Sequence, residues 1–198
     1  PAPDTESTLG ARLADIQAGV NALGKLADGG IHVTVNKAVW NSSPFHKLEN
    51  ATVHAVSGRH PAGNVGVQIS HIAPILKGET VWTMPVFAVA ALGHVINTGK
   101  LDLTRKVAVT GPVVADPAYV VALPGTPVRE LTEVPTDARV IGGDVLSGET
   151  LGADGYLGFF QDQLTLLHEG TEREWGGRAA PCRATGRGIL GRPAAIRR

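Results

Sequence analysis

The pattern of apolar residues changes shortly after Leu101, and this change limits the architectures open to the chain. Before it, apolar residues recur at helical spacing or in alternation; after it, they form short β-branched runs separated by Gly and Pro. A length of 198 residues allows one large domain or two small ones. The sequence therefore predicts an α/β unit followed by a smaller, mostly β unit, with a boundary near residues 100–106.

Two helices are expected in the first unit. Apolar residues that step by 3 and 4 predict a helix ending before Gly29-Gly30: Leu9, Leu13, Ile16, Val20 and Leu23. The apolar run 86–96 predicts the second helix, because Thr83 and Pro85 stand where an N-cap and a first turn belong and Gly99 follows as a stop.

Alternating apolar residues predict the strands. In the first unit they fall at 31–35 and 50–58, whereas 65–73 fits either a third strand or the start of a helix. In the second unit, short β-branched runs at 106–112, 118–125, 138–149 and 164–170 predict strands, and 126–133 is the one stretch that suits a helix. Helix, strand, strand, helix followed by several strands favours an α/β layer with a β-rich unit after it.

Cysteine usage and hydropathy exclude several classes of protein. Cys182 is the single cysteine, so the chain can form no internal disulfide and no zinc or iron–sulfur site built from cysteines alone. The run 86–96 covers about half of the ~20 residues that a bilayer requires. The N-terminus shows no signal-peptide pattern. Contact with a membrane is therefore expected only through a partner.

Charge is unevenly distributed along the chain although the formal net charge is +0. Residues 176–198 contain six Arg and no acidic residue, which leaves 12 basic and 18 acidic residues in 1–175. A basic arm for nucleic acid is the less favoured interpretation, because this stretch lacks Lys, aromatic residues and apolar periodicity. We expect a disordered Arg-rich tail over 174–198 and no nucleic-acid partner.

Common catalytic signatures are missing: there is no G-x-G-x-x-G, P-loop, H-E-x-x-H or G-x-S-x-G pattern. His54, His60 and His71 are 6 and 11 residues apart, which is not a helical metal spacing, and no cluster of carboxylates accompanies them. No metal site is predicted.

The stretch "SGRHPAGNVGVQISHIAP" (57–74) is the best candidate for a functional loop. Pro61 fixes one φ angle, while glycines at 58, 63 and 66 permit positive φ or close backbone approach. Such a loop can present N–H groups to an anion or a carbonyl oxygen, with Arg59 and His60 as charged or titratable partners. A plain strand-to-helix turn explains the same residues equally well.

Five motifs in order resemble one family. They are "SGRHPAGNVGVQISHIAP", "TVW", "NTGKLDLTRKVAVTGP", "RVIGGDVLSGE" and "YLGFFQDQLTLLHEGTERE". With closely similar spacing they resemble the middle of NqrA, the first-named component of the sodium-translocating NADH:quinone reductase (NQR), over residues 14–181.

The resemblance implies a Rossmann-like layer over 1–103 and a small β-grasp unit, of the soluble-ligand-binding (SLBB-like) type, over 104–173. It implies a peripheral component on the cytoplasmic face of the bacterial inner membrane, in a complex that oxidises NADH, reduces ubiquinone and exports Na⁺. The other NQR subunits are the expected partners and carry the flavins and iron–sulfur centres. This chain would bind no cofactor and would not be catalytic alone.

The same resemblance associates the chain with quinone. A quinone needs a flat aromatic surface and donors to its carbonyl oxygens. The candidate contacts are Arg59, His60, Pro61, Gly63, Gly66, His71 and Trp82. Trp82 suits a buried core position as well, and a non-catalytic assembly or protein-binding module is the alternative function.

The chain also departs from the family pattern. Family members are more than twice as long, with a lipoyl-like domain before this region and a further region after it, so truncation at both ends is expected. Gln68 stands where the family has the first of two histidines, the second being displaced to His71, and Asp144 replaces a serine. Past Pro181 the resemblance ends, and we hypothesise out-of-frame readthrough in a fragment or degraded paralogue.

Overall fold

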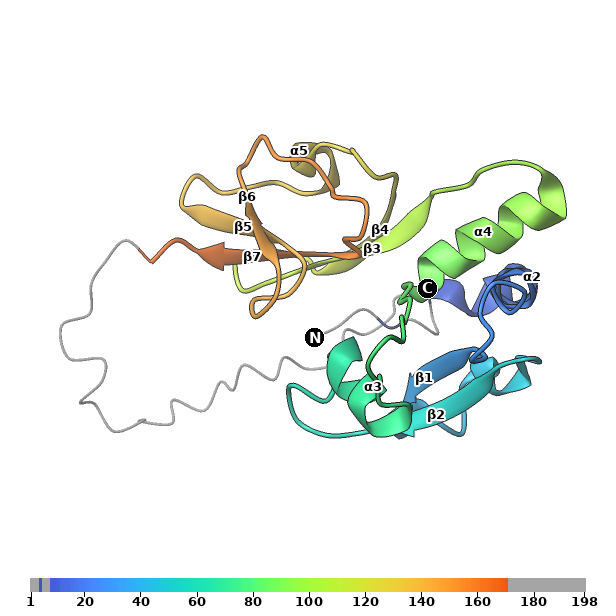
Figure 1. The fold of residues 1–198 in the computed structure, drawn as a ribbon. Coiled ribbons are helices and arrows are strands. Elements are labelled where there is room, and N and C mark those ends of the chain that lie inside the picture. Colours follow the sequence, from blue (N-terminus) through green and yellow to red (C-terminus); the bar gives the residue numbers. More distant parts are fainter. Residues whose placement is uncertain (1–3, 5–7, 171–198) are drawn as a thin grey trace, which may run out of the picture. The chain divides into compact units, whose positions relative to one another are not determined.

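The computed structural model describes residue 4 and residues 8–170 (Figure 1). The chain divides into two compact units, one over Asp4–Leu103 and one from Thr104 onward. Both contain helices and strands, so the mixed α/β class expected from the sequence is confirmed. The Arg-rich tail predicted over 174–198 lies outside the described residues.

In the first unit, the predicted helices and strands form close to their expected positions. The elements are η1 Gly10–Arg12, α2 Leu13–Leu23, β1 His32–Asn36, η2 Lys37–Val39, η3 Pro44–Lys47, β2 Thr52–Val56, α3 Val65–Ile72 and α4 Val86–Thr98. The ambiguous stretch 65–73 is a helix. Pro85, and not Thr83, occupies the N-cap of α4, and Gly99 closes that helix in the left-handed conformation.

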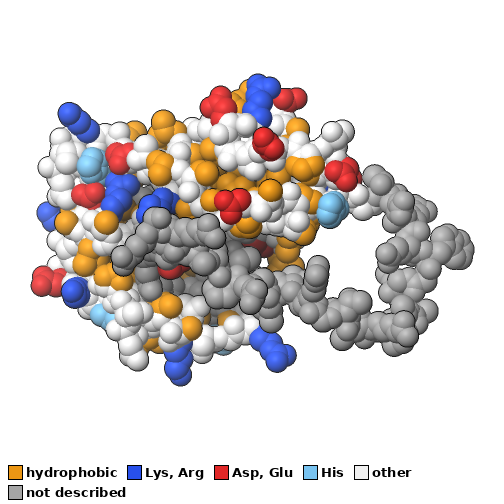
Figure 2. All heavy atoms as spheres, turned by 180° about the vertical axis from the view of Figure 1, so that it is seen from behind, with side chains coloured by type: hydrophobic (Ala, Val, Ile, Leu, Met, Phe, Trp, Pro, Cys, Tyr) orange, Lys and Arg blue, Asp and Glu red, His pale blue; other side chains and the backbone are white. Residues whose placement is uncertain are grey.

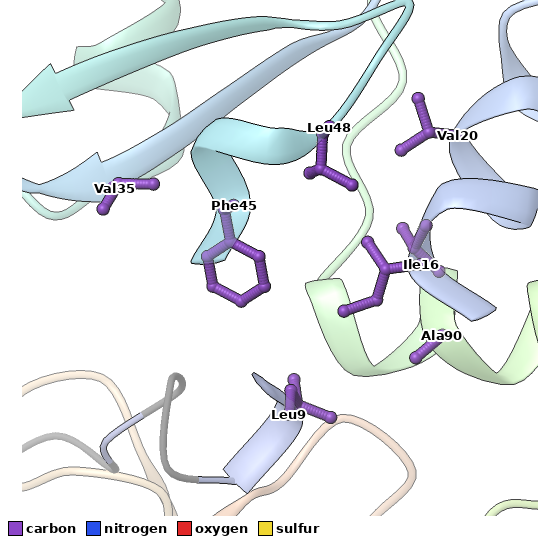
Figure 3. Close-up of a cluster of buried hydrophobic side chains, with 8 residues drawn as sticks. Leu9, Ile16, Val20, Val35, Phe45, Leu48 and Ala90 are labelled. Atoms are coloured by element: carbon purple, nitrogen blue, oxygen red, sulfur yellow. The ribbon is translucent and has the colours of Figure 1, made fainter. Parts of the chain in front are cut away.

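A parallel pair of strands forms the sheet of the first unit, with Val33 opposite Val53 and Thr34 opposite His54. Because side chains alternate along a strand, Val35 points into the core and Thr34 points to the other face. Thr34 is hydrogen-bonded to Gln68 of α3, which places α3 on that face. Apolar side chains from α2, α4 and η3 pack with Val35 on the opposite face, as Figure 3 shows.

Two glycines allow α2 and α4 to approach each other at backbone distance. A Cβ on Gly93 would lie 1.6 Å from the carbonyl oxygen of Asp15, and one on Gly19 would lie 2.4 Å from that of Val89. Any larger residue at either position would therefore force the two helices apart.

A polar cluster on Asp15 connects the same two helices. Its carboxylate contacts His94 Nδ1 at 3.0 Å and accepts a hydrogen bond of 3.0 Å from Asn97 Nδ2, while Arg12 Nε lies 3.5 Å away. Burial disfavours the charged carboxylate, but the hydrogen bonds from Asn97 and His94 and the nearby positive charges outweigh it and lower the pKa of Asp15.

The second unit contains a five-stranded sheet in the order β4-β3-β7-β5-β6. Its elements are β3 Arg105–Thr110, β4 Ala118–Ala122, α5 Val128–Leu131, β5 Ala138–Gly142, β6 Glu149–Leu151 and β7 Gln163–His168. β3 and β7 are parallel, and the other pairs are antiparallel. The predicted run 138–149 is thus a strand, a turn and the start of a second strand. The core consists of Val107, Ala122, Val128, Val140, Leu157, Leu164 and Leu166.

Candidate functional site

The candidate loop joins β2 to α3 as an exposed tight turn. Gly58 opens it with φ of +147°, a conformation that other residues rarely adopt, and a Cβ there would lie 2.8 Å from the Cβ of Ala62. At Gly63 and Gly66 a Cβ would meet nothing within 4 Å, and neither residue has positive φ. The expected need for glycine is confirmed at position 58 and is wrong at positions 63 and 66.

The backbone of the turn is largely hydrogen-bonded to itself. The N–H of Ala62 donates to the carbonyl oxygen of Arg59 at 2.9 Å, and the N–H of Asn64 donates to that of Pro61 at 2.8 Å. The amides on either side of Gly63 therefore already have acceptors, and a bound oxygen would have to compete with them. In this state the turn does not expose a row of free N–H groups.

Gln68 links the turn to the sheet, a role that the sequence did not suggest. Its Nε2 donates to the carbonyl oxygens of Ala62 and Gly63 at 3.2 and 3.3 Å. Its Oε1 accepts a hydrogen bond of 3.0 Å from Thr34 Oγ1 in β1. The position that departs from the family pattern thus has a structural use, because a carboxamide can accept from the strand and donate to the turn at once.

The predicted contact residues are mostly exposed but do not converge. Arg59, His60, Pro61 and Gly63 lie in the turn, Gly66 in the first turn of α3 and His71 in its last turn, and Trp82 lies in the connection to α4. No hydrogen bond, ion pair or ring contact joins the side chains of Arg59, His60, His71 and Trp82 within the described residues.

Trp82 is 91% exposed, so its alternative assignment to the core is wrong. It belongs to a segment between α3 and α4, residues 73–85, that displays further apolar side chains. Ile75, Leu76, Val81 and Met84 of this segment are exposed as well. A flat indole with apolar neighbours is available at this surface.

A second apolar surface lies at one end of the sheet in the second unit. Gly142 at the end of β5 pairs with Leu164 near the start of β7, so the turn after β5 and the loop before β7 share one end. We call the exposed side chains there the apolar end: Leu123, Val145, Leu146, Phe159 and Phe160. Figure 2 shows hydrophobic side chains reaching the surface in patches among polar ones.

Two polar residues hold the loops of the apolar end in place. Arg105, buried in β3, donates from Nη2 to the carbonyl oxygen of Gly158 at 2.7 Å and from Nη1 to that of Phe159. Burial lowers the pKa of Arg105 and raises that of Asp162, and their mutual attraction opposes both shifts. Asp144 accepts from the N–H groups of Leu146 and Ser147 at 2.7 and 3.0 Å, so the departure from serine supports the turn.

The described part of the chain contains no group of three or more His, Cys, Asp and Glu side chains placed to share a metal ion. Among the same residues, no helix has the length and apolar character needed to cross a membrane.

Family models match both units in order. A model described as the NqrA second alpha/beta domain matches residues 1–101. A model described as the NQRA C-terminal domain matches residues 106–152. The two units thus correspond to successive domains of one class of protein.

Relatives over most of the chain are all NqrA proteins of a Na(+)-translocating NADH-quinone reductase. That of Saccharophagus degradans is 36% identical over 176 residues, which are 87% of this chain and 39% of the relative. That of Pseudomonas aeruginosa is 37% identical over 178 residues, 88% of this chain and 39% of the relative. That of Neisseria meningitidis is 36% identical over 171 residues, 84% of this chain and 38% of the relative.

The chain belongs to the NqrA family of the Na⁺-translocating NADH-quinone reductase, as its motifs predicted. It spans about two fifths of the length of the relatives that it matches.

Proposed function

We propose that this chain acts as a subunit, or part of one, in a sodium-pumping NADH:ubiquinone oxidoreductase and contributes to quinone binding there. The match of both units to consecutive NqrA-type domains carries this proposal. In it, the chain lies at the cytoplasmic face of the bacterial inner membrane and reaches the membrane through the other NQR subunits. NADH oxidation, flavins and iron–sulfur centres belong to those subunits.

The proposal includes the finer folds of the two units. Helices on both faces of the parallel pair β1–β2 support a Rossmann-like layer for 1–103. In the second unit the first and last strands, β3 and β7, are parallel neighbours, and α5 lies within the connection between them. This arrangement supports a β-grasp unit of the SLBB-like type over 104–173.

Trp82 is the residue on which the quinone proposal depends most. Its exposed indole offers a face for the quinone ring, and Arg59, His60 and His71 are exposed donors on the same unit. Protonated histidine or arginine would stabilise negative charge on a quinone oxygen as it is reduced. Because these groups do not converge here, a neighbouring surface in the complex would complete the slot, with Pro61, Gly63 and Gly66 shaping the turn.

Titration of the purified chain with a short-chain ubiquinone, followed by tryptophan fluorescence, tests this contact. We expect saturable quenching that Trp82→Phe removes, whereas Trp40→Phe, a change in the core of the same unit, leaves it in place. Trp40 packs against that core, so its variant is the matched control. Absence of binding at high micromolar quinone, both in the chain alone and in the assembled complex, would overturn the proposal.

The apolar end favours a second candidate, a non-catalytic assembly module. Phe160 is 70% and Leu146 is 69% exposed, and side chains of this kind mark protein contacts when they gather. Co-purification with the other NQR subunits tests this function. Phe160→Asp and Leu146→Asp should each abolish co-elution, and Leu26→Asp, at an 83% exposed position of the first unit, should not. Normal co-elution of both variants would exclude the apolar end as the contact.

A further inference from the structure

Two histidines that are far apart in the sequence meet on the exposed face of the β1–β2 pair. His32 opens β1, and His54 lies two positions further along β2 in the parallel register, where His32 is opposite Thr52 and Thr34 is opposite His54. His32 Nδ1 and His54 Nε2 are 2.9 Å apart. The rings are stacked, with centroids 5.1 Å apart and an interplanar angle of 30°. Neither the resemblance nor the proposed function uses this pair.

The separation of the two nitrogens matches a pair of ligands on one metal ion. Imidazole nitrogens bind late first-row metals at about 2.0–2.1 Å. Two nitrogens 2.9 Å apart at such bond lengths subtend an angle of roughly 90° at the metal. A tetrahedral ion would need them roughly 3.4 Å apart at the same bond lengths. The pair therefore fits adjacent ligand positions in square-planar or octahedral geometry.

We propose that His32 and His54 form a two-histidine site for a divalent late first-row metal ion, with Cu²⁺ or Ni²⁺ preferred to Zn²⁺. The ion would replace the proton that the two nitrogens share, so that each offers a lone pair. Imidazole ligands suit these ions, whereas Ca²⁺ and Mg²⁺ require several oxygen ligands. Water completes the coordination, because His32 lies on an exposed face.

The surroundings of the pair suit a bound cation with neutral neighbours. The register partners Thr34 and Thr52 are hydroxyl residues, and the hydroxyl of Thr34 already donates to Gln68. No carboxylate is in hydrogen-bond or ion-pair contact with either imidazole among the described contacts. The metal is thus held by nitrogen alone, which favours Cu²⁺ and Ni²⁺ over harder ions.

A bound ion would link the two strands of the small sheet. A ligand that binds the folded state and not the unfolded one raises stability as its concentration exceeds the dissociation constant. Metal binding should therefore raise the melting temperature of the first unit. This effect gives the site a readout that does not depend on the activity of the NQR complex.

Calorimetric titration of the full chain with Cu²⁺, Ni²⁺ and Zn²⁺ tests the site. We expect one ion per chain, Ni²⁺ bound more tightly than Zn²⁺, and a rise in melting temperature. His32→Gln and His54→Gln should each abolish tight binding, because one imidazole remains. His71→Gln, which removes an exposed histidine of α3, is the matched control and should bind as the wild type does.

The Cu²⁺ spectrum of the unchanged protein decides the case even where a variant fails to fold. Electron paramagnetic resonance of the one-to-one complex should show hyperfine coupling to two imidazole nitrogens. Coupling to one or none, or binding that survives both single substitutions, would overturn the site. Tighter binding of Zn²⁺ than of Ni²⁺ would overturn the geometry assigned to it.

Discussion

Replacing Gly93 by alanine should destabilise the first unit more than any other single-methyl change in it. The added Cβ would lie 1.6 Å from the carbonyl oxygen of Asp15, and ordinary contact begins at 3.4 Å, so the helices must separate by roughly 1.8 Å. The obstacle is backbone, which cannot rotate away. Overpacking costs about 1–3 kcal/mol and at times more, and we expect the upper end of that range or above.

The separation would also weaken contacts that depend on the same approach. Asp15 lies on α2 and its partners His94 and Asn97 lie on α4, at 3.0 Å each. Moving the helices apart by more than an ångström breaks hydrogen bonds of this length. The loss of these bonds adds to the steric cost.

Gly66→Ala is the matched control for Gly93→Ala. Gly66 lies in α3, where a Cβ would meet nothing within 4 Å. Alanine is favoured over glycine inside a helix by roughly 0.5–1 kcal/mol, so this variant should be more stable than the wild type. The same chemical change is thus expected to have opposite signs at two helical positions of one unit.

Urea unfolding followed by the fluorescence of Trp40 measures both variants, because Trp40 packs against the core of the first unit. Each variant is best made in a Trp82→Phe background, so that the exposed indole does not dominate the signal. The reasoning is refuted if Gly93→Ala lies within 1 kcal/mol of the wild type, about the smallest cost expected of overpacking. It is equally refuted if Gly66→Ala is the less stable of the two.

Three further outcomes follow from the polar contacts. The pKa of Asp15 is lower in the folded state than its ordinary value of 3.8, so its stabilising effect is present above pH 4 or so and is lost as the pH falls through the folded pKa; acid unfolding of the first unit should be less steep in Asp15→Asn. Arg105→Met should destabilise the second unit by about 3 kcal/mol in thermal unfolding followed by circular dichroism, because it leaves the buried Asp162 and two carbonyl groups without their partner; an unchanged melting temperature would contradict this. Gln68→Ala should speed hydrogen exchange of the Ala62 and Asn64 amides while Ser70→Ala does not, since Gln68 alone of the two holds the turn to β1.

Local periodicity was sufficient to place most elements of the first unit. Leu13, Ile16, Val20 and Leu23 fall in α2 and face the core that it covers because their spacing is set by one helix. The stretch 65–73 could not be decided locally, since Val65, Val67 and Ile69 alternate as a strand would. Its helical state is favoured by long-range bonds from Gln68, which no periodicity reports.

The site residues were harder to predict because their roles depend on the fold. Trp82 was consistent with core or surface, and only the course of the segment between α3 and α4 exposes it. His54 was compared with His60 and His71, its neighbours in sequence, whereas its partner is His32 on the next strand. Such a pair requires the parallel register, which the sequence of either strand alone does not contain.

The central position of β7 has a consequence for how the second unit is synthesised and folds. β7 is the last strand made, yet it lies between β3 and β5 and is paired with both. Until Gln163–His168 has left the ribosome, the unit can form only two separate hairpins, β3–β4 and β5–β6, each too small to be stable alone. The closing contacts join residues some 55 positions apart in the chain, as between Ala108 and Gln163, and contacts of this range slow folding. Nascent chains of this unit therefore expose the edges of both hairpins until the final strand arrives, which is when they are most open to aggregation or to chaperones.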